Sequence, residues 1–198
     1  MRRRSLIALL AALTACGSGE PVFEVTDLPR LVLQKEEAPK GTTLLDDSSG
    51  YRSIEVFAED DQEQTDLLVA GFVSSYVNTF LAPELFGEHR LNPAASLAVS
   101  YAILFDDAGA AERGIEVVKQ DLLRDGTDLI GREAPPFGSD GFGLYGDLQA
   151  GRPPGFAFVW RIGNVVQALV AAGARGAIRE EAALTLARAM ATRAERLR

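Results

Sequence analysis

Few side chains in this sequence have the types and spacing that catalysis or metal binding requires. The only histidine, His89, lies between Glu88 and Arg90 in a polar segment. A zinc site needs several histidine or cysteine ligands, and no second one lies near it in the sequence. A serine–histidine–aspartate relay would also have to use His89, and no serine occupies a Gly-x-Ser-x-Gly turn. We therefore predict an exposed loop histidine, no metal site and no catalytic residue.

Acidic residues gather between positions 55 and 66. They could bind a divalent cation, but the segment lacks the glycine and the alternating ligand spacing of a calcium loop. A solvated helix start fits the pattern better. A carboxylate pair for sugar hydrolysis stays open, because its geometry is three-dimensional. The acidic residues are Glu55, Glu59, Asp60, Asp61, Glu63 and Asp66.

A loop rich in glycine and proline spans residues 135–143. It is not a phosphate loop, since it lacks the Lys-Ser/Thr ending and a helix directly after it. It is either a surface turn that leads into a strand or a flexible cover over a binding cleft. Phe158 and Trp160, in the strand predicted over 156–162, either pack in the core or line a ligand-binding site. The candidate ligand-facing residues are Phe137, Phe142, Tyr145, Phe158 and Trp160.

The N-terminus has the three parts of a lipoprotein leader. Three arginines at positions 2–4 precede a short apolar stretch, and Leu13-Thr14-Ala15-Cys16 follows it. This ending resembles the lipobox of bacterial lipoproteins. The resemblance implies cleavage between Ala15 and Cys16, with a diacylglycerol and an N-acyl chain attached to Cys16. We expect no other cofactor. An uncleaved leader with an ordinary cysteine is the alternative.

Charge limits the classes of partner. The chain has 20 basic and 28 acidic residues, so loss of the three leader arginines leaves 17 basic residues and a net charge of about −11. Such a field repels phosphate backbones, which argues against nucleic-acid binding. No apolar run reaches the ~18 residues that a spanning helix needs. We expect membrane contact through the lipid, on the extracytoplasmic face of the cell membrane or outer membrane.

Composition divides the chain into three parts. We predict a signal peptide over 1–15, a lipid anchor and tether over 16–50, and one domain over 51–198. Acidic, glycine and proline residues dominate the tether, which is typical of loops.

The clearest predicted element is a C-terminal hairpin. Strands 156–162 and 165–170 flank Gly163-Asn164, which suits a type II′ turn. Its register places Phe158, Trp160 and Ile162 on a bulky face and leaves small residues on the other. We expect the helix that follows, from Ile178 onward, to pack on the small face.

Two further segments complete the predicted fold. Residues 96–105 form a strand, and Asp106 or Asp107 caps a helix that stops near Gly126. Residues 69–81 are ambiguous, and a strand is favoured over a helix, with Phe72, Tyr76 and Phe80 facing one way. The predicted class is α+β, an antiparallel sheet with two or three helices mostly on one face.

The mature domain carries a second resemblance. Residues 158–166, Phe-Val-Trp-Arg-Ile-Gly-Asn-Val-Val, precede a terminal helix that ends Ala-Thr-Arg-Ala-Glu-Arg-Leu. This looks like a pattern in small extracytoplasmic α+β domains of actinobacterial lipoproteins and sensor proteins. The motif is structural, so it implies no catalytic residue.

These observations favour a non-enzymatic envelope lipoprotein, a tethered module that binds or senses an envelope protein or an apolar ligand. The alternatives are a carrier of an apolar ligand or lipid, and an envelope hydrolase that uses two carboxylates.

Overall fold

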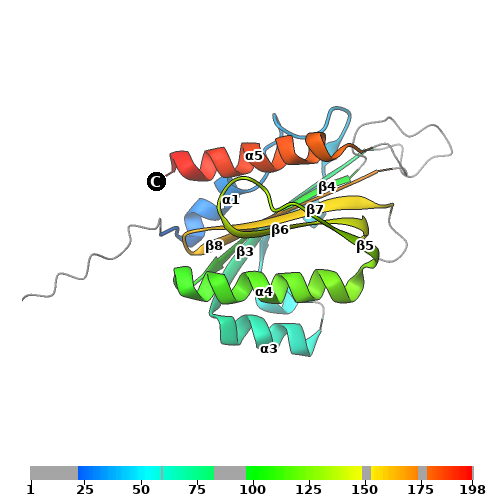
Figure 1. Cartoon of the computed structure of the whole chain (residues 1–198). Coiled ribbons are helices and arrows are strands. Elements are labelled where there is room, and N and C mark those ends of the chain that lie inside the picture. The colour runs from blue at the N-terminus through cyan, green and yellow to red at the C-terminus, as the bar shows by residue number, and fades with distance from the viewer. Residues whose placement is uncertain (1–21, 59, 83–96, 149–152, 174–177, 198) are drawn as a thin grey trace, which may run out of the picture.

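The structure is a computed structural model in which helices flank an antiparallel sheet (Figure 1). The leader with Ala15 and Cys16, and also His89, lie outside the described residues. Within the described part of the chain, no helix is both long and apolar enough to cross a membrane. The structure describes residues 22–58, 60–82, 97–148, 153–173 and 178–197.

Within the described residues, eight strands form one sheet, and seven of them follow in the order β1-β3-β4-β8-β7-β6-β5. The short β2 pairs with the same edge of β3 as β1, and every neighbouring pair is antiparallel. With the helices, this sheet confirms the α+β class. The strands are β1 Thr43–Leu44, β2 Gly50–Arg52, β3 Phe72–Leu81, β4 Leu97–Phe105, β5 Thr127–Arg132, β6 Ser139–Asp147, β7 Gly155–Ile162 and β8 Val165–Ala172.

The C-terminal hairpin of β7 and β8 has the predicted register. A type II′ turn requires a positive φ at its first central residue and a negative φ at its second. Gly163 has a φ of +59° and the φ of Asn164 is not positive, so both residues meet this requirement. A two-residue loop at Gly163-Asn164 predicts five cross-strand pairs, and all five are observed: Ala157 with Val170, Phe158 with Leu169, Val159 with Ala168, Trp160 with Gln167, and Ile162 with Val165.

The ambiguous segment 69–81 divides between the end of α3 and the strand β3. The strand interpretation is correct from Phe72 onward. The predicted common face is wrong for Phe72, because a bulge between Phe72 and Ser74 shifts the register. Phe72 therefore packs beside Phe105, while Tyr76 lies on the other face.

Aspartate side chains cap the N-termini of helices α3 and α4. Asp60 accepts a hydrogen bond from the backbone N–H of Glu63 at α3, and Asp107 accepts one from Ala110 at α4, both at 2.7 Å. Gly126 follows the last residue of α4, as predicted. The α-helices are α1 Leu28–Leu31, α2 Ile54–Phe57, α3 Asp61–Ala70, α4 Ala108–Asp125 and α5 Glu180–Arg196, and short 3-10 turns are η1 Val25–Asp27 and η2 Asp46–Ser48.

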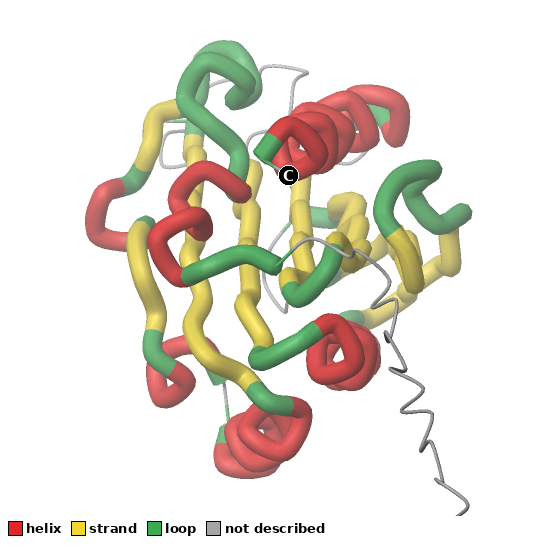
Figure 2. The backbone as a smooth tube through the Cα atoms, turned by 90° about the vertical axis from the view of Figure 1, so that its left-hand side faces the viewer, coloured by secondary structure: helices red, strands yellow, loops and turns green. Residues whose placement is uncertain are grey.

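The helices lie on both faces of the sheet rather than mostly on one (Figures 1 and 2). Helices α1 and α5 cover one face, and α3 and α4 lie on the other. The expected packing of the C-terminal helix on the small face of the hairpin is wrong, since α5 packs on the bulky face around Phe158 and Trp160. The inward stripe of α5 is nearly all alanine and leaves room for these rings: Ala183, Ala187, Met190, Ala191 and Ala194.

Part of the predicted tether contributes to the folded domain. Leu28, Leu31 and Leu33 are fully buried in the core beneath α5. Phe23 is held at the β7–β8 turn, where its N–H donates to Asn164 Oδ1 (2.7 Å) and its carbonyl oxygen accepts from Asn164 Nδ2 (3.0 Å). Residues from Phe23 onward therefore belong to the folded body.

A glycine allows α4 to approach the sheet closely. A Cβ at Gly114 would lie 2.0–2.7 Å from three ring atoms of Phe105, a buried residue of β4. The ring of Phe105 thus occupies the space that any other residue at position 114 would need.

We predict that Gly114→Ala destabilises the protein by about 1–3 kcal/mol, because overpacking outweighs the gain of ~1 kcal/mol in helix propensity. Urea unfolding measures this change. Gly109→Ala in the same helix is the matched control, since its nearest contact would be 3.4 Å from Asp107 Oδ1. Equal stability of the two variants would contradict this account of the packing.

Candidate functional site

A cleft of about 720 Å³ lies on the α4 side of the sheet. Its floor is formed by β3, β4, β8 and β7, one wall by the second half of α4, and the opposite wall by η2, β2 and α2. The first half of α4 packs on Phe105 and Val166, near the β7–β8 turn. The cleft therefore extends toward the other end of the strands, where Leu97 pairs with Ala172 and both residues line it.

The floor is apolar because of the two-residue alternation of the strands. Val99 of β4 pairs with Val170 of β8, and both are half-buried. Tyr101 lies beside them, opposite Ala168. On β7, Ala157 adds only a methyl group. Small and branched side chains leave this part of the face uncovered, which creates the space above it.

An aromatic contact fixes the wall opposite α4. The ring of Phe57, the last residue of α2, lies edge-on to Tyr101 with centroids 6.0 Å apart, and it also contacts Phe72 at 5.8 Å. This contact holds α2 against the floor of the cleft. Val56, the neighbour of Phe57, also lines the cleft and is 65% exposed.

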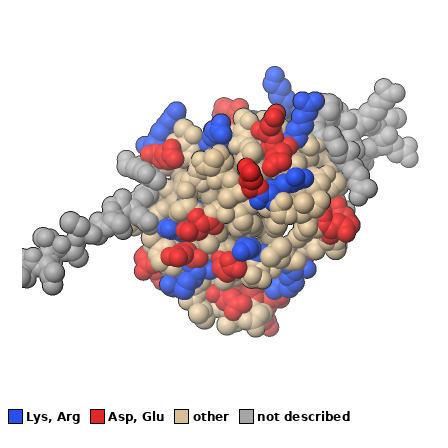
Figure 3. All heavy atoms as spheres, in the orientation of Figure 1, with Lys and Arg blue, Asp and Glu red and all other residues tan. Residues whose placement is uncertain are grey.

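Carboxylates line the cleft where α3 meets α4. Asp121 and Asp125 come from α4, and Glu63, which is only 4% exposed, comes from α3. Arg124 forms ion pairs with Asp121, with Asp125 at 3.5 Å and with Asp60 at 3.3 Å. Figure 3 shows acidic and basic side chains interspersed over α3 and α4.

The acidic surroundings change the protonation of Asp121. Burial, followed by the negative charges of Glu63 and Asp125, raises the pKa of its carboxyl to about 6, against the opposing effect of Arg124. Its side chain is 20% exposed. An apolar floor beside a carboxylate with a raised pKa is typical of a ligand-binding site.

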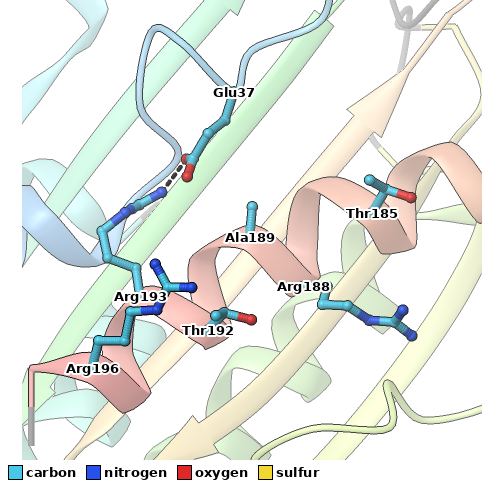
Figure 4. Close-up of a pocket in the computed structure, with 7 residues that line it drawn as sticks. All are labelled: Glu37, Thr185, Arg188, Ala189, Thr192, Arg193 and Arg196. Atoms are coloured by element: carbon cyan, nitrogen blue, oxygen red, sulfur yellow. Dashed lines mark hydrogen bonds and ion pairs between the residues drawn. The ribbon is translucent and has the colours of Figure 1, made fainter.

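A second hollow, of about 370 Å³, lies on the outer side of α5 (Figure 4). Arg193 forms an ion pair there with Glu37 and donates to the carbonyl oxygen of Arg30 at 3.0 Å. This arginine thus fastens α5 to the segment that follows α1. The hollow is built on one helix and Glu37, and we take the cleft as the candidate site.

The five predicted ligand-facing aromatic residues lie elsewhere, and none of them lines the cleft. Phe158 and Trp160 are fully buried under α5. Phe137 packs edge-on against Trp160 at 5.0 Å. Arg132 lies over the ring of Tyr145 at 5.4 Å, and Lys119 lies over Phe142 at 6.0 Å.

Among the described acidic residues of segment 55–66, Glu63 lines the cleft, while Asp60 caps α3. No group of three or more potential metal ligands comes together within the described residues. The sequence analysis did not single out Asp121 and Asp125. Their spacing of four beside the apolar stripe of α4, Val118 and Leu122, is the pattern that could have identified them.

Comparisons with known proteins identify one similar fold. No protein-family model matches the chain, and no curated protein matches it. The extracellular domain of PknH from Mycobacterium tuberculosis, known from a crystal structure, aligns with a TM-score of 0.56 and 13% sequence identity. The alignment covers 89% of this chain and 100% of that one. The two chains share a fold. At this identity no residue role is transferred.

We predict that Asp121→Asn flattens the pH dependence of stability. The folded carboxyl titrates at about 6, and an unfolded one near ~3.9. The folded state thus binds more protons between these values, and the free energy of unfolding falls as pH rises from about 4 to about 6. The variant should lose about 2 kcal/mol of this decrease. Urea unfolding at several pH values tests it, and identical slopes in both proteins would contradict it.

Proposed function

We propose that this protein is a non-enzymatic extracytoplasmic module that is anchored to the membrane through Cys16 and binds a small apolar or amphipathic ligand. The observation that carries the proposal is the cleft of about 720 Å³ over an apolar strand floor. Its volume lies within the range of ~300–1,000 Å³ typical of small-molecule sites. Binding would bury Val99 and Val170, which are half-buried without a ligand.

Two independent observations support an extracytoplasmic location. The leader carries a basic start, an apolar stretch and a lipobox-like ending at Cys16. The similar fold occurs in a domain that is itself extracellular. Sensing is the role we favour for a module of this kind, and transport of an apolar ligand or lipid is the second candidate, favoured by the same apolar floor.

The geometry at Phe23 defines how the anchored domain would sit. Residues 17–22 join Cys16 to Phe23, and at ~3.5 Å per residue this connection spans at most ~25 Å. Asn164 holds Phe23 at the β7–β8 turn. This end of the sheet would therefore lie nearest the membrane.

A hydrolase with two carboxylates is the competing proposal, since Glu63 and Asp121 both line the cleft. Sugar recognition requires many hydrogen-bonding groups, and the floor here is formed by side chains such as Val99 and Val170. This composition favours binding over hydrolysis. Release of soluble sugar from cell-wall glycan by the wild type, and not by Asp121→Asn, would overturn the non-enzymatic proposal.

We predict that Cys16→Ser abolishes lipid attachment, because the hydroxyl cannot replace the thiol as the acceptor of the diacylglycerol. The variant should leave the detergent phase in a Triton X-114 partition and lose incorporation of labelled palmitate. Ser18→Ala, which retains the thiol, is the control and should behave as wild type. Wild-type protein recovered from the cytosol with its initiator methionine and a free thiol would contradict the anchor.

We predict that Val99→Trp blocks the cleft from its floor and weakens binding of the neutral dye Nile red by at least about tenfold, or ~1.4 kcal/mol. Val69→Trp, at a position 76% exposed on α3, is the matched control and should bind normally. Fluorescence titration measures affinity, and circular dichroism verifies folding. The proposal fails if the wild type does not bind Nile red or if Val99→Trp binds it equally well.

A further inference from the structure

Negative charge predominates among the ionisable groups that line the cleft. Among the described residues, four acidic ones line it, against a single arginine, Arg52 of β2. The acidic residues come from three separate elements, so their charges converge on the cleft instead of following one exposed helix face. They are Asp47 of η2, Glu63 of α3, and Asp121 and Asp125 of α4.

Arg124, which lies outside the lining, does not remove this excess. Arg124 is shared among Asp121, Asp125 and Asp60. One guanidinium thus faces three carboxylates. Where burial lowers the local dielectric, such an imbalance acts strongly on a bound charge.

The behaviour of Asp121 agrees with this geometry. Burial is the largest cause of its raised pKa, and the charges of Glu63, Asp125 and Asp60 raise the pKa as well, against Arg124. Burial disfavours a charge of either sign, whereas the neighbouring carboxylate charges disfavour a negative group and favour a positive one.

The acidic groups adjoin the apolar floor. Val118 and Leu122 line the cleft from the same turns of α4 that carry Asp121 and Asp125. A ligand whose apolar part lies on Val99 and Val170 could therefore place a polar head beside these carboxylates.

Resting on the proposed binding function, we infer that the ligand is a cationic amphiphile, with an ammonium or guanidinium head beside Asp121 and Asp125 and an apolar body on the strand floor. Charge complementarity selects the head, and the apolar floor selects the body. An anionic amphiphile would bring like charge to the carboxylates.

Three ligands that share a decyl chain test the inference: decyltrimethylammonium, neutral decyldimethylphosphine oxide and decyl sulfate. The full chain carries Cys16→Ser so that no lipid is attached, and each ligand is titrated below its micelle concentration by calorimetry at about 150 mM salt, which screens long-range attraction. We expect the cation to bind about tenfold more tightly than the neutral ligand, and the anion to bind most weakly.

Variants distinguish recognition by the cleft from general attraction to an acidic protein. Asp121→Asn with Asp125→Asn should abolish the preference for the cation over the neutral ligand. Glu112→Gln removes an exposed charge from the same helix outside the cleft and should keep the preference. Val99→Trp should weaken binding of all three ligands.

The outcomes separate the inference from the function on which it rests. If the neutral ligand binds as tightly as the cation, or if the double variant keeps the preference, the cationic head is wrong and the binding function stands. If none of the three ligands binds, or if Val99→Trp changes nothing, the binding function itself fails.

Discussion

The unequal distribution of volume between the two faces of the β7–β8 hairpin is the constraint on which the structure depends. Alternation along β7 directs Phe158 and Trp160 to one face, so that Ala157 and Val159 must occupy the other. The bulky face requires a partner with little volume, which the alanines of α5 provide. On the face with small residues, α4 packs closely against the sheet near the β7–β8 turn. Farther from the turn, the same face forms the floor of the cleft. One pattern therefore accounts for both the core and the cleft.

Buried polar groups determine how the N-terminal segment joins this core. Gln167 is fully buried, accepts a hydrogen bond from Trp160 Nε1 at 2.8 Å and donates to the carbonyl oxygen of Leu31. Leaving such groups unpaired would cost roughly 1–3 kcal/mol each. Asn164 makes a similar connection to Phe23. These contacts bridge more than a hundred positions of sequence, and they explain why a segment with the composition of a loop is part of the fold.

Local patterns predicted the local structure well, and the arrangement in space less well. The hairpin register, the cap at Asp107 and the class of the fold follow from short-range alternation and capping. The face chosen by α5 does not, because it depends on the sum of volumes across two elements distant in sequence. The cleft was missed for the same reason: Glu63 and Asp121 are 58 positions apart in the numbering and meet only where α3 packs beside α4. Phe158 and Trp160 were predicted as candidate ligand-facing residues because they are large and aromatic, yet both fill the core.

The contact between Asn164 and Phe23 also sets a direction for the molecule. Strand β8 leaves this point and reaches Ala172, roughly 25 Å away at ~3.3 Å per residue, where Ala172 and Leu97 line the cleft. In a lipid-anchored protein, the point of attachment and this part of the cleft would lie at opposite ends of the sheet. Solutes of the aqueous compartment would reach that end directly, whereas acyl chains of the supporting bilayer would have to travel the length of the sheet to reach it.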